Sequence, residues 1–225
     1  LLRNLAHEVR NPLGGLRGSA QLLEQELSED SLKEYTQIII NEADRLQNLM
    51  NRMLTPHQMP IYKKTNIHEI LERVRSLILS EFSTDISFVR DYDVSLPEFV
   101  VDREKLIQAI LNIARNGAQA MKQNKQEEMK LSFVTRAERQ IVFRKKKHAT
   151  AIRIDIIDNG PGIKNELIDK IFFPLVTGNE NGSGLGLSLA QNLIALHQGM
   201  IDCHSVPGKT IFSIILPIEN NLEPT

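Results

Sequence analysis

The chain has 225 residues, of which 41% are hydrophobic, and its 27 basic and 28 acidic side chains leave a formal net charge of −1 at pH 7. This length suits one large domain or two modest ones, each with a real core. The near balance of charge creates no global field toward nucleic acid or a membrane surface, so we expect neither as a partner. The sequence contains no run of about 18 apolar residues and no signal peptide, which predicts a soluble, cytoplasmic chain.

Cys203 is the single cysteine, which excludes an internal disulfide and is compatible with a reducing compartment. Its short apolar, strand-like surroundings favour a buried, inert thiol over a reactive one. The chain lacks a starting methionine and begins within a helical pattern, so we expect it to be a fragment of a longer protein.

The first stretch, LLRNLAHEVRNPLGGLRGSAQLLEQEL, places apolar residues at alternating spacings of three and four, which predicts a helix that packs on other helices. Its interior nevertheless contains Pro12, Gly14, Gly15 and Gly18. These residues cost a helix about 6 kcal/mol in total. Asn11, Gly14 and Gly18 follow His7 at helical spacing, so they form a strip of little bulk where another protein can approach the histidine. We interpret this strip as a docking and reaction surface.

A turn near Asp30 and Ser31 should separate this helix from a second one. The second helix has a predicted seam at Leu32, Tyr35, Ile39, Glu42, Leu46, Leu49 and Met53. Two such helices form an antiparallel hairpin, and one hairpin alone leaves half of each seam exposed. Pairing of two copies into a dimeric four-helix bundle would bury the seams. The alternative is that the hairpin packs on the rest of its own chain.

The segment TPHQMP contains two prolines and predicts a linker, which divides the chain into domains at residues 1–57 and 58–225. Beyond it we expect helices at 67–77, 102–121 and 185–197, the first capped by Asn66. Strands are expected at 85–92, 130–135, 140–144, 149–158, 200–206 and 210–217. The basic run at 144–148 favours a solvated hairpin tip over a binding patch. This pattern predicts an α+β protein whose second domain is a two-layer α/β sandwich with a mixed sheet.

Three separate elements of the second domain can bind a ligand. Asn112 and Asn116 lie one helical turn apart, where their amide oxygens can coordinate a hard cation or simply meet water. In IIDNGPGI, an apolar strand ends at Asp158, which can accept a hydrogen bond from an exocyclic amine such as that of adenine or form an ordinary Asx turn. The glycines of this element are Gly160 and Gly162.

The third element, NENGSGLGLSLAQNLI, places three glycines before an amphipathic helix, at positions Gly182, Gly184 and Gly186. Exposed backbone N–H groups at a helix start can bind phosphate oxygens. The segment is not a Walker motif, because GK[ST] is absent. It is not a dinucleotide fingerprint either, because no strand directly precedes it.

In this order, the three elements resemble the asparagine box and the two glycine boxes of the GHKL (Bergerat) ATP-binding fold of sensor histidine kinases. Phe172, Phe173 and Pro174 stand where that family has its phenylalanine box, and HEVRNP at residues 7–12 resembles its phosphoacceptor box. The stretches HEVRNPLGGLRGSAQLLE, FFPLVTG and GSGLGLSLAQNLI resemble the nitrogen-regulation branch of the family.

The resemblance implies a kinase that uses ATP and Mg²⁺. It implies Asn116 as the principal Mg²⁺ ligand, supported by Asn112. The implied nucleotide contacts are Asn112, Asn116, Asp158, Gly160, Gly162, Phe173, Gly182, Gly184, Leu185, Gly186 and Thr210. Gln119 and Gln191 depart from the residues common in the family, so we expect fewer phosphate contacts in the short lid that precedes Gly182.

The resemblance also implies that His7 attacks the terminal phosphorus of ATP through Nε2, with Glu8 orienting its tautomer. Related ATPases carry a water-activating glutamate at the position of Asn112, and an amide cannot act as that base. The spacing Glu8-x-x-Asn11 resembles the motif that dephosphorylates the partner protein, so we expect kinase and phosphatase activities. Alternatives are a GHKL ATPase that drives conformational change and a non-catalytic scaffold.

The partners implied by the resemblance are a second copy of the chain and a response regulator whose aspartate receives the phosphoryl group. Within the nitrogen-regulation branch this regulator is NtrC-like, and a PII-type signalling protein exerts control. No single residue identifies either of these two partners.

Overall fold

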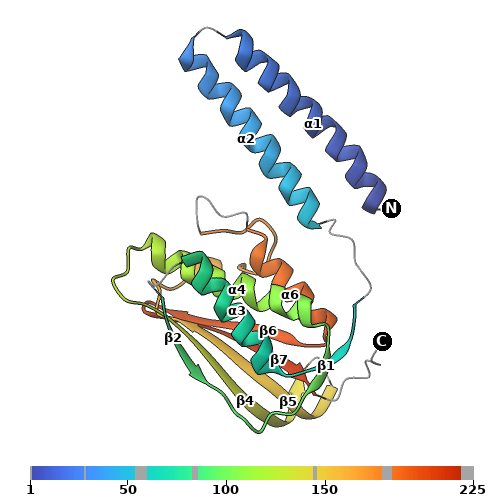
Figure 1. Ribbon diagram of the computed structural model, residues 1–225, viewed down its shortest axis with the longest axis vertical. Coiled ribbons are helices and arrows are strands. Elements are labelled where there is room, and N and C mark those ends of the chain that lie inside the picture. Colours follow the sequence, from blue (N-terminus) through green and yellow to red (C-terminus); the bar gives the residue numbers. More distant parts are fainter. Residues whose placement is uncertain are drawn as a thin grey trace. The chain divides into compact units, whose positions relative to one another are not determined.

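A computed structural model describes the backbone of residues 2–27, 29–53, 60–82, 86–143, 146–178 and 184–218. The side chains of these residues are described except at 2–11, 30, 31, 45–53, 143 and 146. The chain divides into two compact units, Leu1–Met59 and Pro60–Thr225 (Figure 1). The predicted boundary between residues 57 and 58 lies outside the described residues.

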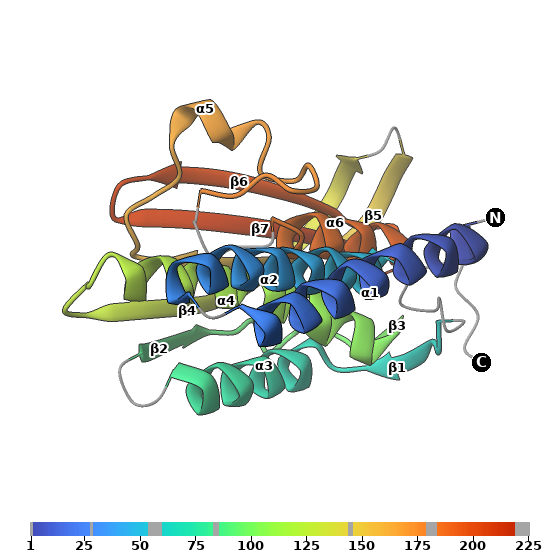
Figure 2. The same ribbon diagram turned by 90° about the horizontal axis from the view of Figure 1, so that it is seen from above.

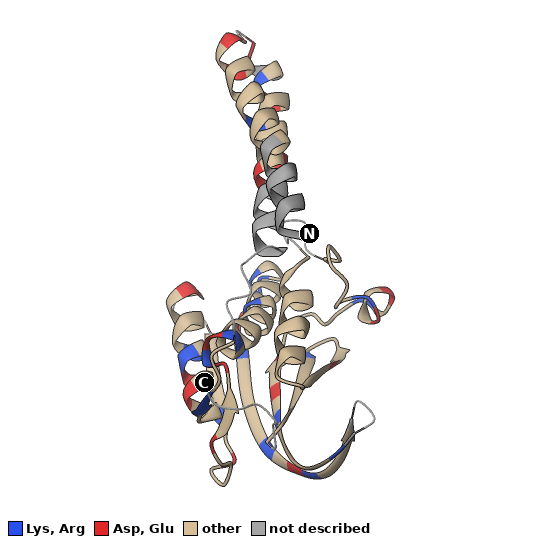
Figure 3. Cartoon of the chain, turned by 90° about the vertical axis from the view of Figure 1, so that its right-hand side faces the viewer, with Lys and Arg blue, Asp and Glu red and all other residues tan. Residues whose placement is uncertain are grey.

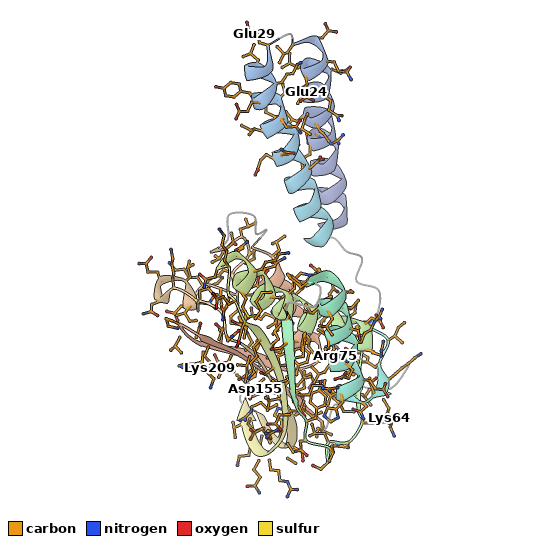
Figure 4. All side chains as sticks on the ribbon, turned by 60° about the vertical axis from the view of Figure 1, so that its left-hand side comes forward. Glu24, Glu29, Lys64, Arg75, Asp155 and Lys209 are labelled. Carbon is orange, nitrogen blue, oxygen red and sulfur yellow. The ribbon has the colours of Figure 1, made fainter. Side chains whose placement is uncertain are left out.

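The first unit is a hairpin of two helices, α1 (Leu2–Glu26) and α2 (Asp30–Met53), as predicted. Glu29 lies in the turn between them, and Glu24 lies in the last turn of α1 (Figure 4). Pro12 stands within α1. The Nε of Arg17 donates to the Asp44 carboxylate at 2.7 Å across the hairpin, an exposed ion pair worth at most about 1 kcal/mol. The hairpin is therefore held mainly by its apolar contacts.

The contact between the two helices uses a stripe of α2 that lies beside the predicted seam. Its described buried residues are Leu13, Ala20, Thr36, Ile40 and Ala43. Two members of the predicted seam, Tyr35 and Ile39, are 66% and 45% exposed. The prediction was that a single hairpin leaves half of each seam exposed, and Tyr35 and Ile39 belong to the exposed part. Helix α2 carries two adjacent apolar stripes, and the contact inside the hairpin uses the other one. Among the described residues, the exposed stripe is not covered within the hairpin.

The second unit contains a five-stranded mixed sheet. Its order is β2 (Ile86–Asp91), β4 (Met129–Phe143), β5 (Lys146–Asp158), β7 (Lys209–Pro217) and β6 (Met200–Val206). The β2–β4 pair is parallel and the other pairs are antiparallel. Three helices, α3 (Ile67–Phe82), α4 (Arg103–Gln123) and α6 (Gly186–Leu196), lie on one face of the sheet (Figure 1). The predicted two-layer α/β sandwich is confirmed.

Alternation along the strands assigns the two faces of the sheet. Ile152, Ile154 and Ile156 of β5 point to the helices and are at most 2% exposed. Full burial of such a side chain contributes roughly 1.5–3 kcal/mol. On the opposite face, Asp155 (labelled in Figure 4) accepts a hydrogen bond from the Ser213 hydroxyl at 2.8 Å. The core thus lies between the sheet and the helices.

Several short elements differ from the sequence prediction. The two strands expected at 130–135 and 140–144 are one strand, β4, because its pairing with β5 runs from Leu131 opposite Asp158 to Phe143 opposite Lys146 (Figure 2). Of the basic run at this hairpin, residues 144 and 145 lie outside the described residues. The prediction also missed β1 (Lys63–Thr65), β3 (Phe99–Val101) and α5 (Asn165–Ile168), which are too short to show a period.

Further predictions concerned the charge of the surface, the absence of a membrane span and the reactivity of Cys203. Basic and acidic residues are interspersed along the described ribbon (Figure 3). No described helix combines the length and the apolar character needed to cross a bilayer. Cys203 on β6 is half-buried, and burial raises the pKa of its thiol to about 12. At neutral pH this thiol is protonated, which makes it a poor nucleophile.

Candidate functional site

Asn112 and Asn116 project from α4, one turn apart. Helix α4 begins at its N-cap residue Asp102, whose side chain accepts from the backbone N–H of Lys105 at 3.1 Å. Asn116 is exposed, whereas Asn112 is half-buried and its Nδ2 has no hydrogen-bond partner among the described residues. A buried donor without a partner costs about 1–3 kcal/mol. The Asn112 amide is therefore available to a ligand.

Asp158 stands at the end of β5 and is only 6% exposed. Its Oδ1 accepts from the backbone N–H of Gly160 at 2.9 Å, which is the Asx turn that the sequence left as an alternative. A Cβ on Gly117 of α4 would lie 2.9 Å from Asp158 Oδ2, so the glycine makes room for the carboxylate. Burial raises the pKa of Asp158 above its ordinary value. One carboxylate oxygen thus serves the turn, and the other lies beside α4.

Thr210 is the cross-strand neighbour of Asp158 on β7 and is 3% exposed. Its hydroxyl is hydrogen-bonded to the Ser205 hydroxyl at 2.9 Å. The Ser205 oxygen also accepts from the backbone N–H of Ile163 at 2.9 Å. Gly162 has φ +82°, and a Cβ there would lie 3.0 Å from the backbone of residues 206 and 207. The loop after Asp158 is thus fixed against the β6–β7 turn.

The start of α6 lies beside Asn112. The nearest atom to a Cβ built on Gly186 is the Cβ of Asn112, at 4.0 Å. The N-cap residue, Leu185, is buried and provides no side-chain cap, so the cap residue itself leaves the N-terminal N–H groups of α6 free of a side-chain partner. Just before it, Gly184 has φ +65° and its carbonyl accepts from Leu175 N at 2.9 Å. An uncapped helix start beside an unpartnered amide can hold an anion.

The structure therefore brings together two groups of predicted site residues. Asp158, Gly160 and Thr210 form one, and Asn112 with Gly186 forms the other. Helix α4 joins them, because Gly117, which makes room for the Asp158 carboxylate, lies five residues after Asn112. Gly182 and the side chains of three predicted catalytic residues, His7, Glu8 and Asn11, lie outside the described residues.

For Phe173 the structure shows exposure and no contact with the other candidate site residues that are described. Its side chain is 62% exposed, whereas the ring of the neighbouring Phe172 packs edge-on against Phe212 with centroids 6.4 Å apart. A contact between Phe173 and nucleotide stays a prediction from the sequence alone.

The available ligands for a metal ion are neutral. The described residues contain no group of three or more histidine, cysteine or acidic side chains that could hold a metal. Asn112 and Asn116 supply amide oxygens, which suit Mg²⁺, but they supply no charge. These residues fit Mg²⁺ only when it arrives with phosphate, which is the usual manner of binding in phosphoryl-transfer sites.

Sequence reasoning missed Gly117, Ser205 and the contact between Asp102 and His197. The sequence contained a signal for Gly117. A glycine inside a helix lowers helix stability by about 1 kcal/mol, which indicates a packing or functional requirement at that position. Ser205 gave no signal, because an isolated serine in a strand carries no periodic pattern. Asp102 and His197 are 95 residues apart, and only the tertiary fold joins them.

Comparison with known proteins decides the family. Residues 101–220 match the family described as "Histidine kinase-, DNA gyrase B-, and HSP90-like ATPase", and residues 1–59 match the His Kinase A (phospho-acceptor) domain. The chain belongs to this ATPase family. The predicted resemblance to the GHKL ATP-binding fold and to sensor histidine kinases is thereby confirmed.

The relatives of this histidine kinase-like ATPase include sensory histidine kinase/phosphatase NtrB of Vibrio alginolyticus, 50% identical over 97% of the chain. The NtrB of Salmonella typhimurium is 47% identical over the same share. In both comparisons the chain spans 62% of the relative's length.

Solved structures of histidine kinases share the fold. Full-length ShkA in complex with AMPPNP has a TM-score of 0.63 at 24% identity, covering 100% of this chain and 47% of that one. ThkA in complex with the response regulator protein TrrA has a TM-score of 0.60 at 24% identity, covering 96% of this chain and 60% of that one.

Substitution Gly184→Ala is expected to destabilise this histidine kinase-like ATPase strongly. A Cβ at this position would lie 2.5–2.9 Å from the Leu175 backbone, and the positive φ adds strain. Gly208→Ala is a matched control, because Gly208 has φ +82° but open space around it. The free energy of unfolding of the control should fall only by what the left-handed conformation costs an alanine, about 1–3 kcal/mol. Denaturant unfolding measures both variants, and equal losses would contradict a steric role for Leu175.

Proposed function

We propose that this chain is the catalytic part of an ATP-dependent protein-histidine kinase. It autophosphorylates on His7 and transfers the phosphoryl group to an aspartate of a response regulator. The observation that carries the proposal is the surroundings of Asn112. This amide stands in place of an acid, its buried Nδ2 has no partner among the described residues, and it lies beside the start of α6, where Leu185 provides no side-chain cap. An amide does not deprotonate water at neutral pH, so bound ATP is preserved for a better nucleophile.

The Asp158 group is proposed to hold the adenine. A carboxylate accepts a hydrogen bond from the exocyclic amine, and Thr210 and Gly160 line the same end of β5 and β7. The N–H groups at the start of α6 are proposed to hold the phosphates, next to Asn112 and Asn116. Mg²⁺ bound by these two amides would neutralise charge on the phosphates.

The acceptor in this proposal is the neutral imidazole of His7. Its Nε2 lone pair forms a bond to the terminal phosphorus, while the bond between that phosphorus and the bridging oxygen breaks and ADP leaves. Glu8 accepts the Nδ1 proton and orients the ring. Only the neutral imidazole has the free lone pair that this attack needs.

A homodimer is proposed to bury the second apolar stripe of the hairpin. Its exposed residues on the two helices include Leu16, Leu22, Leu23, Leu32, Tyr35, Ile38 and Ile39. Two such stripes facing each other give the four-helix bundle expected from the sequence.

The variant Ile39→Glu is expected to shift the chain to monomers, because it places a charge in the proposed bundle core. Sedimentation equilibrium measures the mass. Val94→Glu is the control, since Val94 is 91% exposed on a loop of the other unit and its variant should stay dimeric. A monomeric wild type, or a dimeric Ile39→Glu, would exclude this interface.

The proposed protein partner is an NtrC-like response regulator, with control by a PII-type protein. The support is the identity to NtrB proteins, which are named as kinase/phosphatases. The spacing Glu8-x-x-Asn11 supports a second activity, dephosphorylation of the same regulator.

Incubation with ATP labelled at the terminal phosphate tests the function. The proposal predicts label on the protein that is stable to base and labile to acid. Steady release of phosphate without labelled protein would indicate an ATPase, and the absence of both label and turnover would indicate a scaffold. Either of these results contradicts the kinase.

A further inference from the structure

Asp102 and His197 form a buried contact outside the ligand-binding groups. Asp102 is 7% exposed, and its backbone N–H donates to His197 Nε2 at 3.0 Å. Both of its carboxylate oxygens are also occupied. Oδ1 accepts from Lys105 N at 3.1 Å, and Oδ2 accepts from Ile61 N at 3.0 Å. Asp102 is thus held by three hydrogen bonds, to His197, Lys105 and Ile61, so its position is tightly defined.

The partners of His197 determine its protonation state. A backbone N–H can only donate, so Nε2 accepts from Asp102 and the ring proton is on Nδ1. Nδ1 donates to the Leu193 carbonyl at 2.8 Å, which satisfies a carbonyl of the last turn of α6. The side chain is 1% exposed, and burial lowers the pKa of His197, although the Asp102 charge opposes this shift and Lys105 adds to it. A neutral imidazole therefore links the two backbones.

This link sets the register of two helices. It joins the start of α4 to the end of α6, and the two helices pack against each other. Asn112 lies ten residues after Asp102, and Gly186 lies eleven residues before His197. At about 1.5 Å per residue, the two spans are nearly equal, roughly 15 and 16.5 Å. This matches the position of Gly186 beside Asn112, since a Cβ on Gly186 would lie 4.0 Å from the Asn112 Cβ, so the two helices are in register at both ends.

We propose that His197 is a positioning residue for nucleotide binding, which acts through the Nε2 bond to Asp102 and keeps the start of α6 beside Asn112. The inference rests on the proposed function, because it takes α4 and α6 as the two sides of the ATP site. A purely structural histidine would matter equally through either of its two hydrogen bonds. A positioning histidine affects ATP affinity chiefly through the hydrogen bond from Asp102 at the start of α4.

Two variants separate the bonds. The side chain of His197→Gln can place an acceptor oxygen near the position of Nε2, whereas that of His197→Asn can place a donor near Nδ1 but is too short to reach Asp102. Each variant loses one of the two bonds, so both should lose some thermal stability. Only the asparagine variant loses the link between the helices.

The test measures ATP affinity by calorimetry in the full chain, together with circular dichroism and melting temperature. We expect His197→Asn to weaken ATP binding at least fivefold and His197→Gln to stay within twofold of wild type. Equal affinities in all three proteins, or equal weakening in both folded variants, would overturn the inference.

If His197→Asn does not fold, the test depends on His197→Gln alone. A folded His197→Gln variant whose ATP affinity is more than fivefold below that of wild type also overturns the inference. A wild-type chain that binds no ATP would instead overturn the proposed function, which keeps the two failures distinct.

Discussion

His7→Gln is expected to abolish labelling of the protein by ATP, with a loss on the order of 10³-fold or more, as is typical when the nucleophile of a reaction is removed. Glutamine preserves the polarity of the position but provides no lone pair that can attack phosphorus. ATP binding should be unchanged, because the proposed adenine and phosphate contacts all lie in the second unit. Equilibrium binding and labelling are therefore measured on the same preparation.

Two further variants are compared with His7→Gln. His204→Gln is the control, because His204 is exposed on β6 and should label like wild type. Asn11→Ala should keep the label on the protein but lose dephosphorylation of a labelled regulator. If His7→Gln retains its label, another residue is the acceptor. If Asn11→Ala loses labelling and dephosphorylation to the same degree, the proposal of two separable activities fails.

Asp158→Asn is expected to weaken ATP binding roughly 10- to 100-fold, because a hydrogen bond to a charged group contributes about 1.5–3 kcal/mol. The same variant should raise the melting temperature of the nucleotide-free protein. Burial raises the folded-state pKa of Asp158, so its ionised form is a stability cost that the neutral amide removes. One substitution thus moves binding and stability in opposite directions.

The pH dependence follows from the same shift. A carboxyl with a raised folded-state pKa contributes stability at pH values below its unfolded pKa, and this contribution is lost as pH rises through the folded pKa. The stability gap between Asp158→Asn and wild type should therefore shrink as pH falls. Melting curves at several pH values measure the gap. Asp202→Asn, at an exposed position of β6, is the control, and a gap independent of pH would contradict the role of burial.

The long elements of the fold were predictable because they repeat a period over many residues. The helices at 67–82 and 103–123 and the strand ending at Asp158 fall where apolar spacing put them, and Asn66 caps α3 as expected, accepting from His68 N at 2.9 Å. The face of α2 was not predictable, since two adjacent apolar stripes satisfy the same helical period. Which stripe packs inside the hairpin depends on α1, and not on α2 alone.

The candidate site was predictable where the sequence order of its glycines and polar residues matches a family pattern. That pattern gave Asp158, Asn112 and Gly186 but no reason for their geometry. The reason lies in contacts between distant segments, such as Gly117 beside Asp158 and the link between α4 and α6. Such contacts depend on the register of packed elements, which a single sequence does not contain.

Mass spectrometry of the wild-type chain after incubation with ATP tests the central claim most directly, under conditions that preserve acid-labile phosphohistidine. The account predicts a single phosphoryl group on the peptide that contains His7, and fragment ions should assign it to that imidazole. A phosphoryl group on any other residue, or an unmodified chain in a solution where ATP has been hydrolysed, would contradict it.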